Sequence, residues 1–199
     1  MRLLVSGSAV VLACCAFGQS DAWSEDLDAY WAGIEAEFRD STHSPLLPED
    51  RLHFTRLERF DPDEDYRVRA RFKAKAGKEF GMRTTTERMP VYRRVGVLTF
   101  RLKGRKHTLS VYRNKALTED PAYSDHLFVP FTDLTNGVTT YGGGRYLDLK
   151  APLGAEVELD FNRAYAPYCA YGGRYSCPIP PAENHLNAAI EAGVKAYDH

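Results

Sequence analysis

The alternation of apolar and basic residues from Tyr66 to Lys73 is the pattern that most restricts the fold of this chain. Here Tyr66, Val68, Ala70 and Phe72 alternate with three arginines and a lysine. A repeat of two residues places the two sets of side chains on opposite faces of a β-strand. We interpret the basic row as the solvated face of an antiparallel sheet, in preference to an anion-binding site.

Further strands are predicted along the chain. Val95–Leu102 and Thr108–Tyr112 flank a turn that contains Gly104, which predicts a hairpin. Asn136-Gly137, between two strand candidates, is a strong signal for a second hairpin. The other strand candidates, the first of them weak, are Phe80–Thr86, Leu127–Thr135, Val138–Tyr141, Tyr146–Leu149 and Glu156–Phe161.

An amphipathic helix is predicted from Trp23 to Phe38, where apolar residues recur at helical spacing. We expect Trp23 and Trp31 to anchor it on the sheet. The expected fold is mainly β: an antiparallel β-sandwich or a partly open barrel, with the helix over one face or one end. Residues 23–199 are expected to form a single domain that includes a long structured C-terminal loop.

The long loop is predicted at Asn162–Asn184, where the strand pattern stops and prolines, tyrosines and two cysteines gather. The spacing of Cys169 and Cys177 is not typical of zinc sites, so we favour a disulfide. It would close a loop and contribute about 2.5 kcal/mol in the chain-entropy model. The last segment, His185–Tyr197, is compatible with a short helix or a strand.

The N-terminal 22 residues are interpreted as an export signal. Arg2 is followed by an uncharged apolar stretch that ends at Phe17, and small residues suitable for cleavage follow. A lipid attached to Cys14 is the alternative, since Val11-Leu-Ala-Cys14 approximates a lipobox. The mature protein is therefore expected in the periplasm or outside the cell, with membrane contact only through such a lipid.

The overall charge argues against nucleic acid as a partner, because 26 basic residues are balanced by 27 acidic ones. The common hydrolase, zinc-peptidase and nucleotide-binding signatures are absent from the sequence. No metal is predicted, and the cofactor and any reaction stay unknown. A small molecule is the remaining partner.

Polar residues between Leu127 and Asn184 are the candidates for a binding or hydrolytic site. The acids that could act as general bases are Asp133, Asp160 and Glu183. Arg145 and Asn162, with backbone N–H groups at Gly143 and Gly144, could hold a ligand, including an anionic one. Several tyrosines could line a pocket or simply pack the proline-rich loop: Tyr141, Tyr146, Tyr165, Tyr168 and Tyr175.

The alternative is a non-catalytic exported module, structural or interacting, in which the same residues form a buried polar network. Asp133 then shapes the turn at Asn136-Gly137 through a side-chain hydrogen bond. Glycines next to Arg145 would serve a bulge or a close approach of two segments.

Four phrases of the sequence resemble an uncharacterised family, domain of unknown function 1684. They are Pro130-Phe-Thr-Asp-Leu-Thr-Asn-Gly137, Thr140-Tyr-Gly-Gly-Gly-Arg-Tyr-Leu-Asp148, Asp160-Phe-Asn-Arg-Ala-Tyr-Ala-Pro-Tyr-Cys169 and Cys177-Pro-Ile-Pro-Pro-Ala-Glu-Asn184. The resemblance implies no known reaction, cofactor or substrate. The chain departs from the family pattern in His185–Gly193, which is more helix-prone here.

Overall fold

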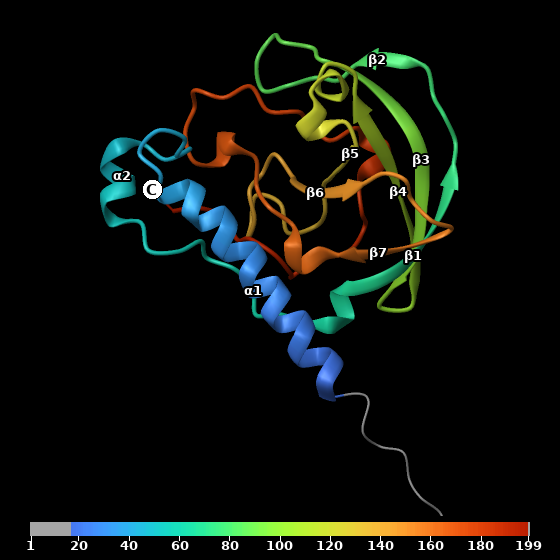
Figure 1. The fold of residues 1–199 in the computed structure, drawn as a ribbon, viewed down its shortest axis with the longest axis horizontal. Helices are drawn as coiled ribbons and strands as arrows, with labels where there is room; N and C mark the ends of the chain where they lie inside the picture. Colours follow the sequence, from blue (N-terminus) through green and yellow to red (C-terminus); the bar gives the residue numbers. More distant parts are fainter. Residues whose placement is uncertain (1–16, 199) are drawn as a thin grey trace, which may run out of the picture.

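A computed structural model describes residues 17–198 and shows one seven-stranded antiparallel sheet, curled into a half-barrel (Figure 1). The strand order is β6-β5-β4-β3-β1-β7, and β2 pairs with β3 beside this path. The strands are β1 Arg67–Ala74, β2 Glu79–Gly81, β3 Val91–Leu102, β4 Arg105–Asn114, β5 His126–Phe131, β6 Arg145–Lys150 and β7 Glu156–Asp160. Of the two predicted β architectures, the partly open barrel is confirmed.

The alternation in β1 gives this strand one buried and one wet face, as predicted. Val68 and Ala70 are buried, whereas Arg69 and Arg71 are exposed. The β3–β4 hairpin is confirmed as well. Its two turn residues, Lys103 and Gly104, both have positive φ angles, of 47° and 76°, as a tight two-residue hairpin turn requires.

The predicted hairpin around Asn136-Gly137 is wrong, because β5 pairs with β6 and residues 138–141 form no strand. The dipeptide does turn the chain, with Gly137 at a φ of 77°. The side-chain amide of Asn136, however, donates to Thr140 Oγ1 and to the Tyr141 carbonyl. These local bonds fold residues 132–144 into a compact loop, so the chain returns to β5 only at Arg145. The strand predicted at Phe80–Thr86 is likewise shorter in the structure, where β2 is Glu79–Gly81 and includes only Phe80 and Gly81 of that range.

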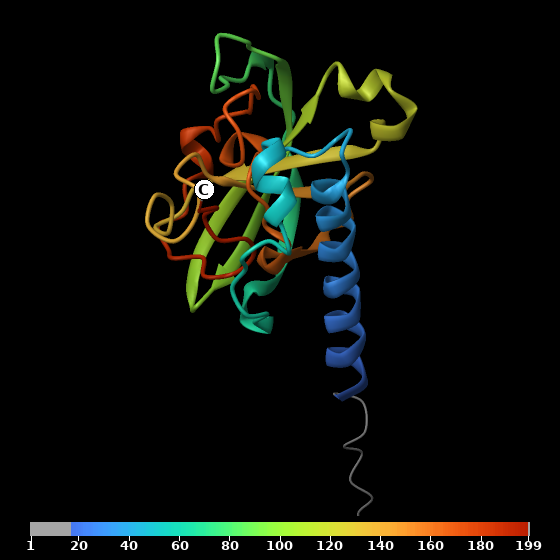
Figure 2. The ribbon, with the colours of Figure 1, turned by 90° about the vertical axis from the view of Figure 1, so that its left-hand side faces the viewer.

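Two helices flank the sheet, α1 at Phe17–Arg39 and α2 at Pro48–His53. Helix α1 stands beside the barrel, as Figure 2 shows from a second side. Trp23 Nε1 donates to Asp160 Oδ2 at 2.9 Å, and Trp31 Nε1 donates to the Asn162 carbonyl at 3.1 Å. The tryptophans therefore anchor the helix, on the segment that follows β7.

One short backbone pairing closes the curl of the sheet. Strands β6 and β7 are its opposite edges, but Tyr165, a few residues after β7, pairs with Tyr146 of β6 through two backbone hydrogen bonds of 2.8 and 3.1 Å. We call this pairing the seam. Inside the curl lies an apolar core that includes Leu98, Val129 and Leu159.

An aromatic cluster covers the outer face of the sheet beside the seam, made of Met82, Tyr92, Tyr112, Phe128 and Tyr146. It arises because alternate residues of β5 and β6 point outward from the apolar core. A third apolar cluster packs beneath α1 and includes Trp31, Phe38 and Tyr171. The pocket described below lies between these two clusters.

The loop and C-terminal segment contain only short 3-10 helices and isolated bridges: η4 Phe161–Arg163, η5 Tyr168–Ala170 and η6 Ala182–Asn184. The earlier 3-10 helices are η1 Glu64–Tyr66, η2 Leu117–Glu119 and η3 Pro121–Tyr123. His185–Tyr197 forms neither of the predicted elements. Its backbone bonds instead to Thr132, Ala164 and Glu58.

The apolar stretch that carries the export prediction, with Cys14, lies outside the described residues apart from its last positions. Within residues 17–198, no helix combines the length and apolar character needed to cross a bilayer.

Candidate functional site

Arg145 is fully buried inside the curl and is paired there with Asp133. Its Nη2 lies 3.0 Å from Asp133 Oδ2, and both side chains have no exposed area. The guanidinium also donates to the carbonyls of Ala192, Ile190 (2.7 Å) and Val194 (3.4 Å). Burial lowers the pKa of Arg145, and the charge of Asp133 opposes this shift. Arg145 thus fastens the C-terminal segment to β6.

Asp133 adopts the turn-shaping role that the alternative hypothesis assigned to it. Its Oδ1 accepts the backbone N–H of Thr135 at 2.8 Å and that of Ile190 at 3.3 Å. The neighbouring glycines fit the close-approach explanation. Gly144 has a φ of 90°, and a Cβ there would lie 2.6 Å from the Phe131 carbonyl oxygen. At Gly143 a Cβ would collide with the Tyr141 ring at 2.4 Å.

Asp160 and Asn162 form a second buried group, at the end of β7. Asp160 Oδ1 accepts from the backbone N–H and the side-chain amide of Asn162, at 2.9 and 2.8 Å. Asn162 also exchanges two 2.9 Å bonds with the backbone of Asp63. Trp23 of α1 donates to the other carboxylate oxygen of Asp160. This group therefore connects α1 with the chain before β1.

Glu183 and Asn184 belong to a third group. The buried Tyr112 donates to Oε1 of the exposed Glu183 at 2.7 Å. The buried Asn184 amide bonds to the N–H and carbonyl of Ser110 and to the Pro130 carbonyl, at 2.7–2.9 Å. Ser110 and Pro130 would be the next pair after Tyr112↔Phe128 of β4 and β5, but proline has no N–H to donate. Asn184 replaces that missing ladder bond.

The predicted site residues therefore do not converge. Arg145 with Asp133, Asp160 with Asn162, and Glu183 with Asn184 each complete a different junction of the fold. This geometry does not test whether these residues bind a ligand or take part in catalysis. Among residues 17–198, no group of three His, Cys, Asp or Glu side chains could hold a metal ion.

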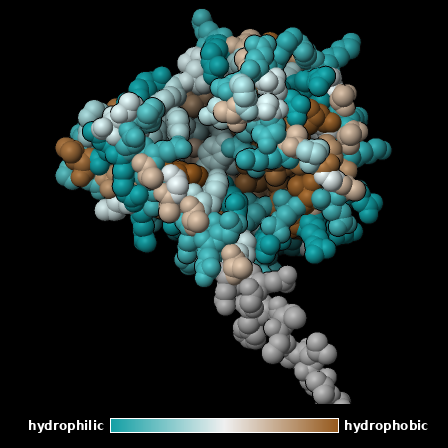
Figure 3. Space-filling model, in the orientation of Figure 1, coloured by the Kyte–Doolittle hydropathy of each residue, from teal (hydrophilic) through white to brown (hydrophobic). Residues whose placement is uncertain are grey.

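An accessible cavity of about 540 Å³ lies elsewhere, on the outer face of the sheet beside the seam. We call it the aromatic pocket. Its walls come from α1, β3, β5, β6, η2, η3 and the loop after β7. Ten phenylalanine and tyrosine rings line it: Tyr30, Phe38, Tyr92, Tyr123, Phe128, Tyr146, Tyr165, Tyr168, Tyr171 and Tyr175. Figure 3 shows the surface hollowed between α1 and β6, with hydrophobic residues near the recess and hydrophilic ones around it.

A chain of polar groups lies in this pocket. His126 Nε2 is 2.9 Å from Asp148 Oδ1, and the Tyr165 hydroxyl donates to Asp148 Oδ2 at 2.8 Å. His126 starts β5 and Asp148 lies on β6, diagonally across from it on the same face. On the opposite wall, Tyr168 donates to Glu37 Oε2 of α1 at 3.2 Å.

Three tyrosines of the pocket, Tyr146, Tyr165 and Tyr168, are held in their neutral form. Burial, followed by the charge of Asp148, raises the pKa of Tyr165 well above its ordinary value. Burial also raises the pKa of Tyr146, and it raises that of Tyr168, with help from Glu37, to about 12. These hydroxyls are therefore hydrogen-bond donors and not phenolate nucleophiles at neutral pH.

Part of this pocket was visible in the sequence. Tyr146, Tyr165, Tyr168 and Tyr175 were candidates for a pocket lining and do line it, whereas Tyr141 packs beneath α1. His126 and Glu37 were missed. The pairing of β5 with β6 places His126 and Asp148 on one face of the sheet. The hairpin predicted at Asn136-Gly137 gave β5 a different partner, so the sequence did not bring these two residues together.

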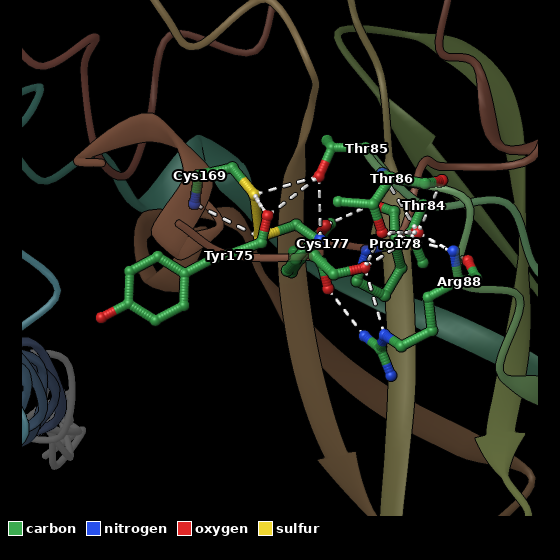
Figure 4. Close-up of a disulfide and its surroundings, with 10 residues drawn as sticks. Thr84, Thr85, Thr86, Arg88, Cys169, Tyr175, Cys177 and Pro178 are labelled. Atoms are coloured by element: carbon green, nitrogen blue, oxygen red, sulfur yellow. Dashed lines mark hydrogen bonds between the residues drawn. A yellow bond between two sulfur atoms is a disulfide. The ribbon is translucent and has the colours of Figure 1, made fainter. Parts of the chain in front are cut away.

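The disulfide between Cys169 and Cys177 is present, with the two Cα atoms 6.2 Å apart. Figure 4 shows it against the Thr84–Thr86 segment. Cys177 exchanges backbone and side-chain bonds with Thr85, at 2.9 and 3.1 Å. Next to it, Tyr146 donates to the carbonyl of Pro178. The bridge thus fixes the part of the loop that forms one wall of the aromatic pocket.

Comparison with known proteins gives relatives but no activity. The solution structure of an uncharacterised protein from Haloarcula marismortui is similar, with 38% sequence identity and a TM-score of 0.70. The match covers 89% of this chain and 96% of the other. No curated protein matches the chain. The sequence pattern of a family described as protein of unknown function (DUF1684) matches residues 52–195, which include all seven strands and the loop. The chain therefore belongs to the DUF1684 family.

Proposed function

We propose that this protein binds a small organic molecule in the aromatic pocket. One observation carries the proposal: a cavity of about 540 Å³ lined by ten phenylalanine and tyrosine rings, with the His126–Asp148–Tyr165 chain at one wall. Ligand sites are typically apolar cavities of about 300–1,000 Å³ with a few placed polar groups. The pocket has both properties.

The residues predicted from sequence are assigned a framework role in this proposal. Arg145, Asp133, Asp160 and Asn162 are buried and bonded to backbone groups or to one another. A ligand in the aromatic pocket meets none of them, because none belongs to its lining.

Export is part of the proposal and is supported by the N-terminal sequence pattern and by the disulfide, which suits an oxidising compartment. Intact mass of the protein isolated from its own cells tests it. A mass lacking about the first 22 residues, or carrying a lipid at Cys14, is expected. A full-length, unmodified chain would contradict export.

Binding is tested with three soluble probes that share one ring: benzylammonium, benzyl alcohol and benzoate. Amide NMR spectra should shift at pocket residues such as Phe128 and Tyr165 with at least one probe. Ile34→Trp should abolish the shifts, because Ile34 lines the cavity and the larger ring would fill it. Ala32→Trp is the matched control, since Ala32 is an exposed residue of α1 outside the lining. No shift with any probe, or equal loss in both variants, would reject the proposal.

A further inference from the structure

Resting on the proposed function, we infer that the ligand of the aromatic pocket is a small organic cation, an amine or a quaternary ammonium compound. The sequence favoured no such class and allowed an anionic ligand. The inference comes from the charges that line the pocket and from the kind of surface between them.

The permanent charges in the lining are both negative. Glu37 lies on the α1 wall and Asp148 on the β6 wall, and no lysine or arginine is among the lining residues. Each carboxylate accepts a tyrosine hydroxyl, which leaves its negative charge in place. A ligand between the two walls therefore meets negative charge from both sides.

The positive side chains around the pocket are engaged by other groups or lie outside the lining. Arg163 lies over the Tyr30 ring, pairs with Asp26 and is 3.6 Å from Asp160. Arg174 lies over the Tyr175 ring and donates to the carbonyls of Ser44 and Leu46. Arg88 donates to the hydroxyl and carbonyl of Ser176. Lys150 is paired in register with His126 at the end of β6, exposed and outside the lining. His126 is the one lining group that can become positive, and it already faces Asp148.

The surface between the carboxylates suits a cation that carries alkyl groups. The face of an aromatic ring is negative, and tyrosine rings attract ammonium groups within about 6 Å. Burial and nearby carboxylates keep Tyr165 and Tyr168 as neutral phenols, so this ring surface persists at neutral pH. An anion would instead need arginine, lysine or free backbone N–H groups, and Arg145 is sealed inside the curl.

The charge preference is measured by calorimetric titration at about pH 8, where an imidazole is ordinarily neutral. The probes are benzyltrimethylammonium, benzylammonium, benzyl alcohol and benzoate. Both cations should bind at least about tenfold more tightly than benzyl alcohol, and benzoate should bind most weakly. If benzyl alcohol or benzoate binds as tightly as the cations, the inference fails while the pocket itself still binds. If none binds, the proposed function fails.

Charge-neutralising variants locate the preference. The double variant Glu37→Gln and Asp148→Asn should weaken benzyltrimethylammonium about tenfold and leave benzyl alcohol within about twofold. The matched control is Glu87→Gln with Glu156→Gln, which removes two exposed carboxylates outside the lining. Equal weakening in both pairs would assign the effect to overall charge and overturn the inference. Thermal unfolding checks that each variant folds. If the double variant does not fold, Glu37→Gln alone, at an exposed helix position, is titrated in its place.

Discussion

Two aspartates in this protein each pair with a nitrogen-containing side chain and differ in their surroundings. Asp133 and Arg145 have no exposed side-chain area, whereas Asp148 and His126 are 44% and 22% exposed. The first pair holds the C-terminal segment in place and is closed to any ligand. The second forms a wall of the aromatic pocket. The degree of burial thus separates an aspartate that builds the fold from one that is able to meet another molecule.

The largest effect is expected from breaking the sealed pair. Arg145→Ala leaves Asp133 as an unpaired buried charge and removes the bonds to Ile190 and Ala192. We expect the free energy of unfolding to fall by about 3–5 kcal/mol, measured by urea denaturation. Arg67→Ala, which breaks the half-exposed pair with Glu158, should cost under about 1 kcal/mol. If Arg145→Ala loses little stability but binds ligand more weakly, Arg145 has the ligand-binding role predicted from the sequence.

The disulfide gives the next largest effect. Replacing Cys169 and Cys177 by serine should lower the free energy of unfolding by about 2.5 kcal/mol, because the unfolded chain gains freedom. Since the bridge fixes a pocket wall, binding of benzyltrimethylammonium should weaken as well. Peptide mass analysis after alkylation, with and without reduction, checks the bond in protein from its own compartment. Freely alkylated Cys169 and Cys177 before reduction would show that the thiols are unpaired there.

Alkaline pH should destabilise the fold through the buried tyrosines of the aromatic pocket. The pKa of Tyr168 is raised to about 12, and those of Tyr146 and Tyr165 are also raised. The folded state therefore keeps protons that the unfolded chain releases above about pH 10. The stability that these protonated tyrosines contribute is fully present below about pH 10 and is lost as the pH rises toward their raised pKa values. The loss is up to about 1.4 kcal/mol per pH unit for each buried tyrosine.

The measurement is denaturant unfolding from pH 9 to about 12, with phenolate absorbance followed in parallel. Tyr146→Phe removes one such titration and should flatten the slope. A stability that stays constant across this range would contradict the buried position of these rings.

The smallest effect is expected from the open pair. Asp148→Asn should change the free energy of unfolding by less than about 1 kcal/mol, because the Asp148 side chain is 44% exposed and an asparagine there can still accept a hydrogen bond from Tyr165. Comparison of its denaturation curve with that of Arg145→Ala tests the contrast directly. A loss as large as that of Arg145→Ala would mean that Asp148 is structural and not part of an open site.

Much of the fold could be predicted from the sequence because its signals are local. The alternation at β1, the glycine-containing turn between β3 and β4 and the stripe of α1 each specify their own element. The partner of β5 could not be predicted in this way. Asn136-Gly137 has the composition of a hairpin turn, but side-chain bonds from Asn136 divert the chain into a loop.

The site was harder to predict, because charged and amide side chains can either form a binding site or complete the hydrogen bonding of the fold. Asp133, Arg145, Asp160 and Asn184 are chemically strong, and the fold uses them where backbone groups lack partners, as Asn184 does beside Pro130. The eight tyrosines of the pocket come from segments far apart in the chain, such as Tyr30 of α1 and Tyr175 of the loop. Which rings gather at one place depends on the curl of the sheet, which no local pattern encodes.

The seam between Tyr146 and Tyr165 also bears on how the molecule behaves in a crowded solution. An uncovered edge strand offers a row of free N–H and carbonyl groups on which a second chain can add, and this is a common start of aggregation. At β6 the loop after β7 occupies this edge through two backbone hydrogen bonds. Because the pocket lies against the seam, an occupant that tightens the loop would shield this edge. Solubility and ligand occupancy are thus expected to rise together.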